Sequence, residues 1–161
     1  MRTMRKLKTA AVLVAALLGQ SVYAAPALAA KSLDLKAMLT FAIEDERIAR
    51  LEYEVIIERL GAVRPFSNIV RAEETHIQWL EGLFAGHGLA VPADTTSRPA
   101  APANLVAALR AGREAEIDNI AMYDRFLAQD LPADVRRVFV QLKAASENHL
   151  RAFATNLGRS A

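Results

Sequence analysis

The chain has 161 residues, with 20 Lys and Arg against 18 Asp and Glu, and it contains no cysteine. The absence of cysteine excludes disulfides, thiolate metal sites and thiol chemistry, so stability must come from packing. One domain of about 130 residues, which remains after the N-terminal segment described next, is long enough for a sizeable core.

Residues 1–29 have the pattern of a secretory signal peptide. Four basic residues within the first eight positions precede a short apolar run, and small residues between Ala24 and Ala30 offer cleavage sites. The apolar run is too short to anchor the chain in a bilayer. We therefore predict a periplasmic or secreted protein with no membrane association after cleavage, whose folded domain spans residues 30–161.

Removing this segment also removes the apparent basic character of the chain. Four of the 20 Lys and Arg lie in it and none of the 18 Asp and Glu does, which leaves 16 against 18 and a net charge of −2. A weakly acidic domain with no basic face gives no reason to expect a nucleic-acid partner. The sequence leaves the oligomeric state open, a homo-oligomer included.

The first two predicted helices form an antiparallel hairpin. The first begins after a cap at Ser32 or Asp34 and ends near Leu60, with Glu46 at the centre of its apolar stripe. The second runs from about Pro65 to Gly86, with Glu73 and His76 inside its stripe. Positions three apart lie about 60° apart on a helix, so these two side chains share a face.

Glu46 and Glu73 lie at unequal distances from the turn that joins the two helices. Glu46 precedes the turn by about fifteen residues, whereas Glu73 follows it by about eight, a difference of roughly 10 Å along the helices. The connection must therefore run back along the first helix for the two carboxylates to meet.

A proline-rich stretch from Val91 to Pro102 follows. About fifteen extended residues can span nearly 50 Å, more than the ~39 Å length of a 26-residue helix, so this segment can cross the whole bundle. The third helix, Asn104 to about Ala128, is then parallel to the second. A short link with Asp134 as cap leads to the fourth helix. With no period-two alternation, the prediction is an all-α four-helix bundle of two antiparallel hairpins joined by a long crossover.

The two hairpins look like copies of one unit. Glu46 and Tyr53 recur seventy positions later as Glu116 and Tyr123, and the segment 72–76 recurs as 145–149, ending in His149. Both matches occur in the same order on corresponding helices, which is more specific than either alone.

Each helix thus directs polar side chains toward the interior, which is costly unless something there uses them. A core histidine satisfied by a neighbouring glutamate would explain one helix, but the recurrence favours a shared site. Carboxylates and imidazoles from four facing helices suit a pair of iron or manganese ions.

The chain resembles the ferritin-like superfamily on its rubrerythrin side, and a group of uncharacterised prokaryotic ferritin-like proteins. The segments that carry the resemblance are 42–53, 66–76, Glu116 with Tyr123, and 145–150. It implies five metal ligands, with Glu73 and Glu116 as candidates to bridge two ions: Glu46, Glu73, His76, Glu116 and His149.

Ser146 departs from the pattern, because the family has glutamate there. Glu147 cannot replace it, since it lies about 200° around the helix from His149. We expect one tighter ion, near His76, and one weaker ion, near His149. The remaining residues are interpreted as surface charges (Glu44, Glu74, Glu114, Glu147), packing residues (Trp79, Met122), a helix-end histidine (His87), and tyrosines that either pack in the core or support the metals (Tyr53, Tyr123).

Two functional hypotheses follow. The first is an exported di-iron or di-manganese protein that oxidises iron or reacts with dioxygen or peroxide; whether it is an enzyme stays open, with di-iron oxidoreductase as the candidate activity. The alternative is a metal-free helical binding module that has lost this chemistry, with Ser146 as the visible step. Without cysteine there is no rubredoxin-like segment, which disfavours a self-contained rubrerythrin-type peroxidase.

Overall fold

The computed structural model describes residues 33–160 as four helices, and no strand occurs within this range. The helices are α1 (Leu35–Leu60), α2 (Phe66–Gly86), α3 (Leu105–Leu127) and α4 (Ala133–Arg159). The predicted all-α four-helix bundle is confirmed. The predicted signal peptide, residues 1–29, and its cleavage sites lie outside the described residues.

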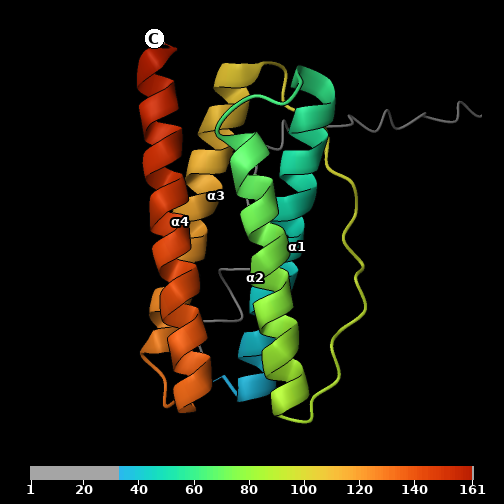
Figure 1. The fold of residues 1–161 in the computed structure, drawn as a ribbon, viewed down its shortest axis with the longest axis vertical. Helices are drawn as coiled ribbons and strands as arrows, with labels where there is room; N and C mark the ends of the chain where they lie inside the picture. Colours follow the sequence, from blue (N-terminus) through green and yellow to red (C-terminus); the bar gives the residue numbers. More distant parts are fainter. Residues whose placement is uncertain (1–32, 161) are drawn as a thin grey trace, which may run out of the picture.

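The helices form two antiparallel hairpins, α1 with α2 and α3 with α4 (Figure 1). The most extensive contacts lie within each hairpin, and smaller contacts of α2 with α4 and α1 with α3 join the two. No helix of the described region is both long and apolar enough to cross a membrane.

The segment between α2 and α3 runs from one end of the bundle to the other, alongside α1 (Figure 1). As a result α2 and α3 are parallel, as predicted. The segment is fastened to α1 by polar contacts: Arg47 donates to the carbonyl of Pro92 over 2.9 Å, Asp94 lies 3.8 Å from the Arg50 guanidinium, and Arg98 pairs with Glu58.

Three helix ends match the sequence prediction and one differs. The side chains of Asp34 and Asn104 accept hydrogen bonds from the first turns of α1 and α3, and Gly61 ends α1 with a φ of 84°. The predicted cap of α4 at Asp134 is wrong, because the helix begins at Ala133 after the extended Pro132. Asp134 lies in the first turn, where the helix dipole favours a carboxylate, and accepts a 2.9 Å hydrogen bond from His87 Nε2.

The first connection runs back along α1, as the levels of Glu46 and Glu73 require. Figure 1 shows that α1 extends past the start of α2, and residues 61–65 lead back down to it. This offset brings the middle of α1 level with the first half of α2.

The apolar interior consists of two clusters, one on each side of a polar level. On every helix, the inward polar residues fall between positions of one cluster and positions of the other. One cluster is formed mainly by Met38, Leu39, Ile43, Leu80, Phe84, Met122, Phe126, Phe139 and Leu142; the other by Tyr53, Ile56, Phe66, Ile69, Ala108, Leu109 and Phe153. The bundle therefore has a polar layer between two apolar layers.

Candidate metal centre

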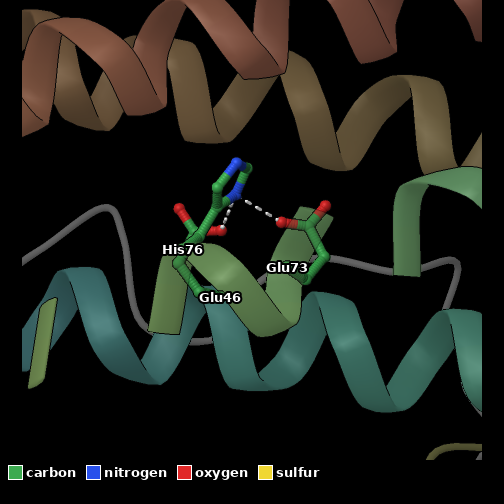
Figure 2. Close-up of side chains that lie close together, drawn as sticks. All are labelled: Glu46, Glu73 and His76. Carbon is green, nitrogen blue, oxygen red and sulfur yellow. Dashed lines mark hydrogen bonds and ion pairs between the residues drawn. The ribbon is translucent and has the colours of Figure 1, made fainter. Parts of the chain in front are cut away.

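The first group of possible metal donors comes from one hairpin. Glu46 on α1 and Glu73 and His76 on α2 are all buried, and each offers a ligand atom within 4.8 Å of the others. His76 Nδ1 lies 3.0 Å from Glu46 Oε2 and 2.8 Å from Glu73 Oε2 (Figure 2). We call this group the first triad.

The second triad needs both hairpins. It consists of Glu73, Glu116 from α3 and His149 from α4, again with donor atoms within 4.8 Å of one another. His149 Nδ1 lies 3.4 Å from Glu73 Oε1 and 3.3 Å from Glu116 Oε1. The structure thus brings all five predicted ligand residues together.

Glu73 belongs to both triads, with Oε2 near His76 and Oε1 near His149. The two imidazole rings stack with centroids 5.8 Å apart. Of the two candidates for a bridging carboxylate, Glu73 occupies the shared position, whereas Glu116 joins only the second triad.

Two tyrosines support the carboxylates that belong to only one triad, Glu46 and Glu116, and each tyrosine lies in the other hairpin from its glutamate. Tyr53 of α1 donates a 2.9 Å hydrogen bond to Glu116 on α3, and Tyr123 of α3 donates a 2.6 Å bond to Glu46 on α1. Both tyrosines are buried, and burial raises their pKa well above the usual value, with further contributions from the glutamate charges. They are therefore core residues and orient the site at the same time.

Protons on the imidazoles balance part of the carboxylate charge. Burial by itself would lower the pKa of His76, but its hydrogen bonds to Glu46 and Glu73 outweigh this and raise the pKa to about 10. The pKa of His149 is raised to about 9, again against the effect of burial, by Glu116 and Glu73. Burial raises the pKa of Glu46, whereas that of Glu73 is lowered because bonds from both histidines outweigh burial.

The donor set fits a metal ion better than a closed network of hydrogen bonds. His149 Nδ1 is buried, yet it has no hydrogen-bond partner among the described residues, although two carboxylate oxygens lie 3.3 and 3.4 Å away. Buried polar atoms are almost always bonded, and an orphaned nitrogen facing two carboxylates is a group that could hold a cation. Mixed carboxylate and imidazole donors suit iron, manganese or zinc.

Ser146 does not face the triads alone, because its hydroxyl belongs to a polar chain that the sequence reasoning missed. Ser146 Oγ donates to Asn119 Oδ1 over 2.6 Å, and Asn119 Nδ2 donates to Asp45 Oδ2 over 2.7 Å. Burial and the nearby charges of Glu46, Glu116 and Glu73 raise the pKa of Asp45 to about 7. Asn119 could have been found: it follows Glu116 by three positions, as His76 follows Glu73.

The other residues singled out from the sequence fall where expected, with one exception. The four glutamates read as surface charges lie outside both triads, and Met122 is buried. The packing role predicted for Trp79 is wrong, because its side chain is 40% exposed. Its ring centroid lies 5.6 Å from that of His76, on the outer side of the first triad. The chain has a single tryptophan, so its fluorescence reports on this position.

The comparisons with known proteins place the fold only. No protein-family model and no curated protein matches the chain. Among solved structures, the chain is similar to a hypothetical protein from Methanococcus jannaschii DSM 2661, with a TM-score of 0.71 and 22% identity over 81% of this chain and 85% of that chain. The chain therefore shares its four-helix fold with an uncharacterised archaeal protein.

Proposed function

We propose that the protein is an exported member of the ferritin-like superfamily that binds two iron or manganese ions at the centre of the bundle. The observation that carries this proposal is the position of Glu73, whose two carboxylate oxygens face two imidazoles from different hairpins. One carboxylate between two histidines is the arrangement that a pair of cations would use. The signal-peptide pattern of residues 1–29 supports a place in the cell envelope or outside the cell.

The first triad and the second triad would each hold one ion, with Glu73 shared. Bound divalent iron or manganese would supply the electrons that reduce dioxygen or peroxide, and would itself be oxidised to the trivalent state. Tyr53 and Tyr123 hold the carboxylates that belong to only one triad in place through their hydroxyl groups. The two apolar clusters on either side keep bulk water from the site, which strengthens every electrostatic interaction within it.

Elemental analysis of protein purified without a histidine tag tests the proposal. After reconstitution under nitrogen with Fe(II) or Mn(II) and removal of free metal, we expect close to two ions per chain. Binding should raise the melting temperature, because a ligand that binds only the folded state stabilises it. Fe(II) should also quench the fluorescence of Trp79, whose ring lies next to His76. Glu74→Gln, an exposed neighbour of Glu73, is the matched control.

A metal-free helical binding module is the second candidate, and one observation favours it. His76 is already satisfied by two hydrogen bonds to carboxylates, and position 146 carries a hydroxyl where a fourth carboxylate would be expected. This candidate predicts a protein that stays metal-free after reconstitution and whose melting temperature does not respond to Fe(II) or Mn(II). That result would refute the proposed metal centre.

A further inference from the structure

Position 146 is the counterpart of Glu73 in the second hairpin. Each residue precedes a triad histidine by three positions, and each is buried. Glu73 brings a charge between the two imidazoles, whereas Ser146 brings none. The three glutamates of the triads would therefore offer three negative charges to two divalent ions, and an unbalanced charge in a buried site is costly.

A fourth carboxylate lies two hydrogen bonds away from this position. Asp45, on α1, accepts from Asn119 on α3, which in turn accepts from Ser146 on α4. Both bonds are short, at 2.7 and 2.6 Å, and they fix the orientation of the Asn119 amide, since reversing it would break both. Asp45 is half-buried as a residue, whereas Asn119 and Ser146 are buried.

We propose that Asp45, acting through Asn119, is the fourth carboxylate of the site and supplies from outside the triads the charge that Ser146 lacks. This inference rests on the proposed metal centre. Asp45 and Asn119 are positioning residues, because neither belongs to a donor group.

The arrangement has a chemical consequence. A glutamate at position 146 would fill coordination positions on the metals with its own oxygens, whereas the chain through Asn119 adds charge and no ligand. The Ser146 hydroxyl has its one hydrogen engaged with Asn119, which leaves only oxygen lone pairs for a neighbouring molecule. The side of the site that faces α4 would thus stay open to water or a small substrate.

Calorimetric titration with Mn(II) at pH 7 tests the inference, with Asp45→Asn compared with the natural protein. Asparagine can still accept the hydrogen bond from Asn119, so the substitution removes the charge and keeps the contact. We expect binding of the second Mn(II) to weaken about 10- to 100-fold, the range found when groups that support metal ligands are removed. The first Mn(II) should bind within about threefold of its natural affinity. Asp118→Asn, an exposed acid on α3, is the control and should change neither step.

A double variant separates charge from structure. Asp45→Asn combined with Asn119→Asp exchanges the acid and the amide, retains a hydrogen-bonded chain to Ser146, and moves the charge one residue closer to the site. It should restore the affinity for the second Mn(II). A purely structural role for Asp45 would leave the double variant as weak as the single one.

The outcomes distinguish this inference from the proposed function. Unchanged binding in Asp45→Asn, equal losses in the Asp118→Asn control, or no recovery in the double variant would each overturn the role of Asp45 while leaving the metal centre in place. If Asp45→Asn does not fold, as judged by circular dichroism, Asn119→Asp alone should tighten the second step, and failure to do so overturns the inference. A natural protein that takes up no Mn(II) would overturn both proposals.

Discussion

The two hairpins contribute unequally to the candidate centre. The first supplies a complete triad from Glu46, Glu73 and His76, with His76 hydrogen-bonded at 2.8 and 3.0 Å. The second supplies only Glu116 and His149 and relies on Glu73 from its neighbour. His149 Nδ1 lies 3.3 Å from Glu116 Oε1 and 3.4 Å from Glu73 Oε1, and it makes no hydrogen bond. One triad thus forms within a local pair of helices, and the other exists only when the two hairpins pack together.

The difference lies in geometry rather than in the number of donors. Each triad has two carboxylates and one imidazole, because Glu73 counts in both. The predicted weakness of the ion near His149 was argued from the missing glutamate at position 146, yet a carboxylate there would be the counterpart of Glu73, whose two oxygens face both imidazoles. The longer distances around His149 are an independent reason to expect the weaker ion in the second triad.

Glu73→Gln should have the largest effect, because it removes the one carboxylate that both triads share. We expect the metal content to fall from about two ions per chain to nearly none, whereas Glu46→Gln should chiefly affect the ion of the first triad. Elemental analysis after anaerobic reconstitution measures this, with Glu74→Gln as control. Equal losses from Glu73→Gln and Glu46→Gln would remove the special position of Glu73.

Ser146→Glu should make the two hairpins alike. The new carboxylate would complete a second glutamate and histidine pair three residues apart, so the affinity for the second ion should rise by about tenfold or more, at least the size of effects from groups beyond the ligands. Calorimetry would show two binding steps of closer affinity. Two equal sites in the natural protein, or an unchanged affinity of the second step in the variant, would refute the asymmetry.

The packing of the two hairpins differs at another matched pair. A methyl group on Gly112 would lie 2.6 Å from Cζ of Phe153, whereas the corresponding positions of the first hairpin hold Ala42 and Leu80, both fully buried. Gly112→Ala should therefore cost about 1–3 kcal/mol of unfolding free energy through overpacking.

Combining this substitution with Phe153→Leu recreates the pair found in the first hairpin and should recover part of that loss. Gly82→Ala on α2, where the added methyl meets open space, is the control and should stabilise by up to about 1 kcal/mol. Urea unfolding measures these three variants and Phe153→Leu alone. Additive effects of the two core substitutions would show that the ring and the glycine are not coupled.

The metal-free protein should lose stability as the pH rises from neutral to alkaline. Both imidazoles have a pKa raised from 6.5, to about 10 for His76 and about 9 for His149, so the folded state holds protons that the unfolded state releases. Their stabilisation is complete below about pH 6.5 and is lost as the pH passes through 9 and 10.

Denaturant midpoints measured in the presence of EDTA between pH 6 and 10 should therefore fall. Of the two imidazoles, that of His149 should lose its proton first, and His76→Gln should reduce the slope. A midpoint that stays constant or rises over this range would contradict the protonated state of the two imidazoles.

Much of the fold could be predicted because its determinants are local. Apolar periodicity, the cap at Asp34 and the length of the proline-rich segment together determine four helices and the crossover. The five donor residues could also be predicted from the sequence, since each interrupts an apolar stripe at a position facing the core. The unequal distances of Glu46 and Glu73 from the first turn also required a connection that runs back along α1, as it does in the structure.

The missed features depend on distances between helices. Nothing in the spacing of α1 says that Asp45, next to Glu46, meets an amide from α3, and Asn119 gains meaning only once Ser146 is seen beside it. Trp79 was interpreted as a packing residue, but it lies outside the apolar stripe of α2 and its side chain is 40% exposed. Which of two glutamates lies between the two imidazoles is likewise decided by how the two hairpins dock.

A crystal structure of the manganese-loaded protein, with anomalous difference maps recorded at the manganese edge, tests the central claim most directly. We expect two peaks on either side of the Glu73 carboxylate, one beside Nδ1 of His76 and one beside Nδ1 of His149, with the second peak weaker at limiting manganese. No peak between α1, α2, α3 and α4, or peaks only at surface carboxylates, would contradict it.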